Sequence, residues 1–180
     1  TPGGGSITPN EDGTVTVPEG GTVQTGSGTE ITLPGGGTVD PETGAVKPNE
    51  GGSVTVKDES ENTTTLTPPS GSGVTPNDDG TVTVPDGSII KTDDGTEITI
   101  GDNNGGNTTV GTDGSINLPE NGTGETTNTD GEKITITAPG TGGTVGTDEN
   151  GNITIPEGGS VQTGDGTEIT LPGGLTGQPE

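Results

Sequence analysis

The chain has 180 residues, no Cys, His, Met or aromatic residue, and a net charge of −24 from 28 acidic residues and four Lys. Only 18% of the residues are apolar and 39 are Gly. This composition excludes an ordinary compact globule, because the cost in chain entropy would exceed what so small an apolar core contributes.

Several functions are also disfavoured by composition. A polyanion without Arg or aromatic side chains is a poor ligand for nucleic acid. No apolar stretch approaches the roughly 20 residues of a membrane span, so we expect no membrane insertion. His and Cys, the commonest carriers of general-base and thiol chemistry, are missing. We therefore predict that the chain is not an enzyme, has no small-molecule substrate and requires no cofactor.

Val and Ile recur in a regular pattern along the chain. From the N-terminus they appear every eight residues, at Ile7, Val15, Val23, Ile31 and Val39. Low hydrophobicity with high charge is typical of disorder, but disorder gives no reason for such a spacing. Ten units of about 16 residues begin near Ile7, Val23, Val39, Val54, Val74, Ile89, Val110, Thr127, Val145 and Val161. The sequence thus predicts one repetitive array over residues 1–180.

A longer duplication overlies these units. Residues 12–36 and 150–174 match at 19 of 25 positions, and the heptapeptide Gly-Thr-Glu-Ile-Thr-Leu-Pro is identical at 28–34 and 166–172. Such duplication predicts that the chain is a segment of a longer array.

Each unit carries an apolar–polar–apolar triplet, for example Val15-Thr16-Val17 and Ile98-Thr99-Ile100. Period two with β-branched residues predicts short strands. Pro follows many of these strands and cannot extend a ladder inside a sheet, while Asp-Gly pairs mark turns. We expect an all-β fold.

Two topologies fit this pattern. In an elongated parallel β-solenoid, each unit is one coil with two short strands, stacked on the coil before it. In a repeated β-hairpin meander, every Asp-Gly is a tight antiparallel turn. We favour the solenoid, because a meander in a single sheet would leave its apolar face uncovered.

Stacked coils would align equivalent residues in columns. The middle residue of the triplet is Thr in eight of the ten units, which predicts a surface Thr ladder formed by Thr16, Thr32, Thr65, Thr83, Thr99, Thr135, Thr154 and Thr170. Flat Thr arrays on β-solenoids bind ice, so an ice-binding module is one alternative function. The other interpretation is that Thr simply favours strands and stacks well.

The turn residues before Gly would form a second column. It contains Asp79, Asp94, Asp113, Asp130 and Asp165, which are candidate ligands for Ca²⁺ because carboxylate oxygens suit that ion. A Ca²⁺-stabilised β-roll that acts as a binding module is therefore a further alternative function. This column resembles the calcium-binding β-roll repeats of secreted bacterial toxins, although their Gly-Gly-x-Gly-x-Asp nonapeptide is absent. The simpler interpretation is that Asp-Gly is good turn chemistry.

In its repeat style the whole chain resembles the acidic, Gly/Thr-rich, low-complexity repeats of bacterial surface adhesins and extracellular fibres. This resemblance implies an extracellular or cell-surface structural or adhesive rod that acts as a stalk, a spacer or a self-assembling filament. Its partners would be further units of a longer chain or other copies joined end to end.

Overall fold

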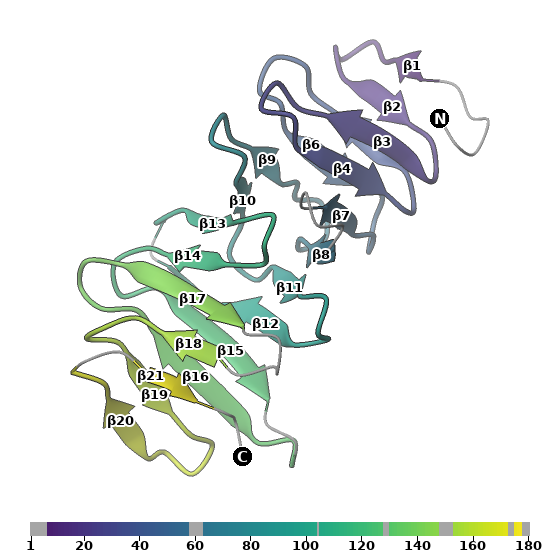
Figure 1. Cartoon of the computed structure of the whole chain (residues 1–180). Coiled ribbons are helices and arrows are strands. Elements are labelled where there is room, and N and C mark those ends of the chain that lie inside the picture. The colour runs from purple at the N-terminus through teal and green to yellow at the C-terminus, as the bar shows by residue number, and fades with distance from the viewer. Residues whose placement is uncertain are drawn as a thin grey trace.

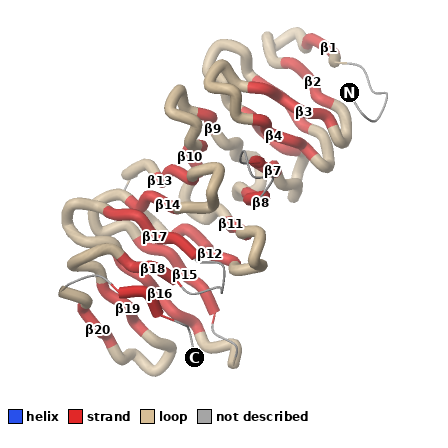
Figure 2. Tube along the Cα trace, in the orientation of Figure 1, coloured by secondary structure: helices blue, strands red, loops and turns tan. Residues whose placement is uncertain are grey.

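The computed structural model describes residues 7–57, 63–103, 105–127, 130–147, 153–172 and 175–177. Within these residues it contains strands, turns and loops and no helix (Figure 2). It follows that no described helix is long and apolar enough to cross a membrane. The predicted all-β class is confirmed.

Ten strands form one continuous sheet, which we call the long sheet. Its spatial order is β20-β19-β16-β15-β12-β11-β8-β7-β4-β3. At ~4.8 Å per strand, this sheet is roughly 45 Å across. Its strands are β3 (Gly21–Gln24), β4 (Glu30–Leu33), β7 (Val54–Lys57), β8 (Thr63–Thr67), β11 (Ile89–Lys91), β12 (Glu97–Ile100), β15 (Thr123–Thr127), β16 (Lys133–Thr137), β19 (Ser160–Gln162) and β20 (Glu168–Thr170).

The other described strands form what we call the split sheet. It has a four-stranded part in the order β1-β2-β5-β6 and a seven-stranded part in the order β21-β18-β17-β14-β13-β10-β9. An isolated antiparallel bridge between Val46 and Val74 joins the two parts. The strands are β1 (Thr8–Pro9), β2 (Val15–Val17), β5 (Gly37–Val39), β6 (Val46–Pro48), β9 (Thr75–Pro76), β10 (Val82–Val84), β13 (Thr108–Val110), β14 (Ile116–Leu118), β17 (Gly143–Thr147), β18 (Ile153–Ile155) and β21 (Leu175–Gly177).

Successive hairpins alternate between the two sheets. β1–β2 belongs to the split sheet, β3–β4 to the long sheet, β5–β6 to the split sheet, and the alternation continues to β19–β20. Among the described strands, ten such hairpins follow one another, and each coincides with one of the ten 16-residue units found in the sequence. The result is an elongated two-layer stack with β1 and β20 at opposite ends (Figure 1).

The expected parallel β-solenoid is wrong. All strand pairs in the described part of the chain are antiparallel, within hairpins such as β3–β4 and between hairpins such as β4–β7. The alternative, a series of hairpins, describes the local connections correctly. The apolar face of these hairpins is not left uncovered, because successive hairpins alternate between two sheets that share one core.

The core lies between the two sheets. Buried Val, Ile, Leu and Ala side chains from both sheets form one continuous hydrophobic cluster that runs from Val17 to Ile155. Side chains of a strand alternate between its two faces, which explains why few apolar residues suffice to fill this core. In Ile98-Thr99-Ile100 of β12, for example, the two Ile side chains point inward and Thr99 points outward.

The connections divide between the two long edges of the stack. A hairpin begins and ends at the same edge, so the described hairpin turns lie along one edge and the described crossovers between sheets lie along the other. We call these the turn edge and the crossover edge. Contacts between neighbouring connections agree with this: Asn49 N–H donates to Gly36 O at the crossover edge, and Thr63 Oγ1 donates to Asp93 Oδ1 at the turn edge.

Glycine makes both kinds of connection possible. In the turn of β9–β10, Gly80 has φ +86° and donates its N–H to Asn77 O, which is a type I turn closed by a left-handed residue. At the crossover Pro85-Asp86-Gly87-Ser88, Gly87 has φ +80° and Ser88 N–H donates to Pro85 O, which is the arrangement of a type II turn.

Candidate functional site

The aspartates of the hairpin turns make the same contacts in turn after turn. Asp79 Oδ1 accepts a hydrogen bond from the Thr81 backbone N–H at 3.0 Å and another from the Thr81 hydroxyl at 2.7 Å. Asp113 makes the equivalent pair with Ser115. These contacts stabilise the turn, because the carboxylate accepts from a backbone N–H that has no strand partner at this position.

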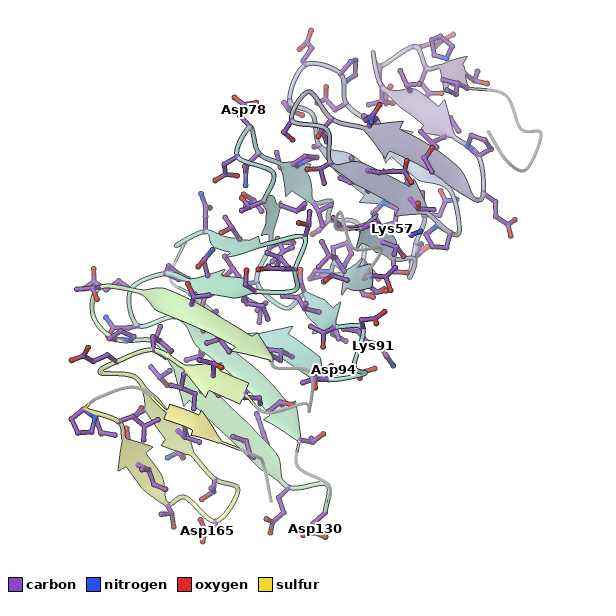
Figure 3. All side chains as sticks on the ribbon, viewed as in Figure 1. Lys57, Asp78, Lys91, Asp94, Asp130 and Asp165 are labelled. Carbon is purple, nitrogen blue, oxygen red and sulfur yellow. The ribbon has the colours of Figure 1, made fainter. Side chains whose placement is uncertain are left out.

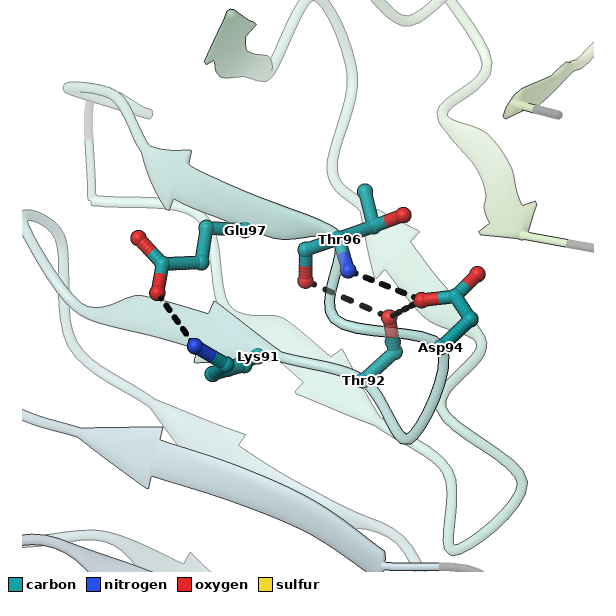
Figure 4. A network of polar contacts seen from close by, with 5 residues as sticks. All are labelled: Lys91, Thr92, Asp94, Thr96 and Glu97. Carbon is teal, nitrogen blue, oxygen red and sulfur yellow. Dashed lines mark hydrogen bonds and ion pairs between the residues drawn. The ribbon is translucent and has the colours of Figure 1, made fainter. Parts of the chain in front are cut away.

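In other turns the hydroxyl comes from a Thr two residues before the Asp. Asp94 Oδ1 accepts from the Thr92 hydroxyl and from the Thr96 backbone N–H (Figure 4). Asp165 accepts in the same way from Thr163 and Thr167. The Thr-x-Asp-Gly-Thr and Asp-Gly-Thr/Ser patterns are thus local turn signals.

These contacts change the acidity of the aspartates. The Thr81 hydroxyl and then the Thr81 N–H hold the pKa of Asp79 below its ordinary value, because both stabilise the ionised form. The Thr14 hydroxyl is the main cause of the lowered pKa of Asp12, and the Thr163 hydroxyl is the main cause of the lowered pKa of Asp165. Asp40 follows the same rule, with the Thr43 hydroxyl as the main cause of its lower pKa.

The alternation of hairpins separates the five aspartates of the expected Ca²⁺ column. Asp79 and Asp113 lie in turns of the split sheet, whereas Asp94, Asp130 and Asp165 lie in turns of the long sheet. All five are exposed, and the labelled Asp94, Asp130 and Asp165 point away from the ribbon (Figure 3). No group of three or more acidic, His or Cys side chains suited to a metal occurs among the described residues. Ca²⁺ binding stays a prediction of the sequence.

The eight threonines of the expected ladder also divide between two surfaces. Five lie on the outer face of the long sheet, namely Thr32, Thr65, Thr99, Thr135 and Thr170, and three lie on the split sheet, namely Thr16, Thr83 and Thr154. All eight point outward as expected, but they do not form one column.

The structure forms rows of hydroxyl side chains that differ from the expected ladder. We call such a row, in which the residues stand opposite one another on neighbouring strands, a hydroxyl rank. On the long sheet, Thr22, Thr32, Thr55 and Thr65 stand directly opposite one another on β3, β4, β7 and β8. On the split sheet a second rank contains Thr75, Thr83, Thr109, Asn117 and Thr144. Sequence reasoning missed Thr22, Thr55, Thr75, Thr109 and Thr144, because their places opposite the triplets depend on the antiparallel register.

Charge is distributed unevenly over the surface. The four Lys lie on strands, and two of them form ion pairs on the outer face of the long sheet: Lys91 with Glu97 at 2.9 Å and Lys133 with Glu125 at 2.6 Å. Turns and crossovers carry acidic residues and no Lys, as in Asp78-Asp79 and Glu157. The two long edges are therefore acidic, while the broad faces are closer to neutral.

An open polar groove of about 550 Å³ lies at the turn edge. It forms where turns of the two sheets meet, and Thr29 Oγ1 donates across this meeting point to Gly80 O at 3.3 Å. Its charged lining residues are Lys57, Asp79 and Asp113. Hydroxyl and turn residues complete the lining: Ser27, Gly28, Thr29, Gly80, Thr81, Gly111, Thr112 and Ser115.

In comparisons with known proteins, no family model, no curated protein and no solved structure matches this chain.

Proposed function

We propose that this chain is an elongated structural or adhesive rod, acting outside the cell as a stalk, a spacer or a fibre segment. The observation that supports this most strongly is the serial alternation of hairpins between two sheets around one core. In such an array each added hairpin contacts only its neighbours, so length grows with the number of repeats while the cross-section stays the same.

The distribution of charge also supports a rod. The long edges of the stack are acidic, whereas the described strands at the ends of the sheets have one edge without a described partner. Like charges along the edges oppose association side by side, and unpaired strands favour addition at the ends.

Electron microscopy of the purified chain tests this proposal. We expect short rods of uniform width, and we expect a tandem fusion of two copies to have twice the length at the same width. Compact particles whose width grows in the fusion would contradict the rod.

The hydroxyl ranks do not favour ice binding as a second function. The rank next to Thr22, Thr32, Thr55 and Thr65 contains Gln24, Glu30, Lys57 and Thr63, so charged side chains interrupt the flat hydroxyl surface.

A further inference from the structure

One end of the long sheet leaves a core position uncovered. Ile31 and Ile169 occupy the same place in identical heptapeptides, but Ile31 is fully buried and Ile169 is 51% exposed. The neighbouring strands explain the difference. β4 pairs with both β3 and β7, whereas β20 pairs with β19 alone among the described strands. Ile169 is thus a core residue without the strand that would cover it.

The long sheet shows how such a position is covered inside the chain. At each internal junction the second strand of one hairpin pairs antiparallel with the first strand of the next, in β4–β7, β8–β11, β12–β15 and β16–β19. At the far end of the same sheet, β3 is a first strand, and no described strand pairs with its outer edge. β20 and β3 are therefore the two halves of one more junction of the same kind.

The side chains of these two strands match in register. If Val23 stands opposite Ile169, Thr22 stands opposite Thr170. This continues the existing hydroxyl pairs Ser160–Thr170 and Thr22–Thr32 across the junction. Val23 is partly buried and already packs against the core, so it can cover Ile169. Gln24 then lies opposite Glu168, which avoids two like charges facing each other.

A junction between two copies also extends the split sheet, provided that β21 of one copy takes the place of β1 of the next. β21 and β1 are both first strands, so they would compete for one position when two copies meet. β1 has only two residues, ends at Pro9, and among the described strands pairs with β2 alone. β21 pairs with β18 over three residues, in the register that β5 has with β2. β21 is thus the stronger competitor for that position.

We propose that this chain binds a second copy of itself head to tail, with β20 of one molecule pairing antiparallel with β3 of the next and β21 replacing the next molecule's β1. This deepens the proposed rod function by naming the contact through which the rod extends. Because each copy carries a charge of −24, mutual repulsion opposes the contact, and added salt should strengthen it.

Sedimentation of the full chain at 50 and 500 mM NaCl tests the contact. We expect linear oligomers that grow with salt for the wild type and for a variant lacking residues 1–9, and monomers for Ile169→Asp. Ile89→Asp is the matched control, because Ile89 is 40% exposed on the outer face of β11, away from both ends. Circular dichroism verifies that each variant remains folded. A wild type that stays monomeric at millimolar concentration would overturn this contact while leaving a monomeric rod intact, and so would an Ile169→Asp variant that still assembles.

Cross-linking gives the register, since the natural chain contains no Cys. Mixing Thr22→Cys and Thr170→Cys proteins under mild oxidation should give a disulfide-linked heterodimer, because opposed residues have Cβ atoms about 5 Å apart. Mixing Thr32→Cys and Thr170→Cys is the control, and it should give much less. Equal yields from the two mixtures would overturn the register.

Discussion

The hydroxyl of Thr29, on the turn of β3–β4, donates a hydrogen bond to Gly80 O on the turn of β9–β10, joining two sheets across 51 residues of sequence. Thr29 is only 8% exposed. Breaking a hydrogen bond between buried groups costs free energy of folding, whereas exposed groups can form hydrogen bonds with water instead. The contact thus ties the long sheet to the split sheet near Val74, which forms the one described bridge between the two parts of the split sheet.

We expect Thr29→Val to destabilise the protein by about 1 kcal/mol, because the Gly80 carbonyl loses a buried donor while the shape of the side chain is kept. Thr167 is the matched control: it lies in the identical heptapeptide but is exposed. Thr167→Val should cost less than about 0.5 kcal/mol. Urea denaturation measures both, and equal losses would contradict the role of the Thr29–Gly80 contact.

The repeated heptapeptide permits a second comparison of the same change in two environments. Ile31→Ala should cost about 2–5 kcal/mol, because it opens a cavity in a fully buried site. Ile169→Ala should cost less than about 1 kcal/mol in the monomer, since half of that side chain is already in water. Hydrogen exchange of β4 and β20 would report each effect locally. Similar losses at both sites would mean that Ile169 is covered in solution.

Asn121 is the single described non-Gly residue with a positive φ, +55°. It occupies the position that Gly87 and Gly158 hold in the equivalent crossover turns. We expect Asn121→Gly to stabilise the protein by roughly 0.5 kcal/mol, because Gly removes left-handed strain at a small entropic cost. Asn117→Gly, in the middle of β14, should destabilise it instead. Thermal melting of the two variants distinguishes these effects by sign.

The turn aspartates predict a pH dependence. Asp79 has a pKa lowered in the folded state by the Thr81 hydroxyl and N–H, so its ionised form contributes stability above the unfolded pKa near 3.8, and this contribution is lost as pH falls through the folded value. Asp79→Asn should therefore melt at a lower temperature than wild type at pH 7. The difference should shrink as the pH falls through the lowered pKa of folded Asp79, because the protonated carboxyl has lost the advantage of its charge. A difference independent of pH would show that the charge of Asp79 is irrelevant.

Added cations should stabilise the array without ion specificity. The charge of −24 is spread over many turns, and no described cluster of three carboxylates is suited to one ion. We expect Ca²⁺ and Mg²⁺ at equal ionic strength to raise the melting temperature by the same amount, through screening. A larger rise with Ca²⁺ that Asp94→Asn and Asp165→Asn abolish would instead support the calcium sites expected from the sequence.

The sequence by itself determined the local structure. The eight-residue spacing of Val and Ile located ten two-stranded units, the triplets located strands such as β4 and β12, and Pro and Asp-Gly located the connections. These features are local because side-chain alternation, the rigid φ of Pro and the left-handed conformation of Gly depend on residues close in sequence.

Only the tertiary structure decided strand direction and sheet membership. Inward Ile98 and Ile100 with outward Thr99 satisfy a parallel coil and an antiparallel hairpin equally, because period two is common to both. Burial against a second layer selected hairpins that alternate between sheets. That choice separated Asp79 from Asp94 and Thr83 from Thr99, and it left Ile169 exposed where its twin Ile31 is buried. Identical residues thus differ only in the neighbours that long-range packing gives them.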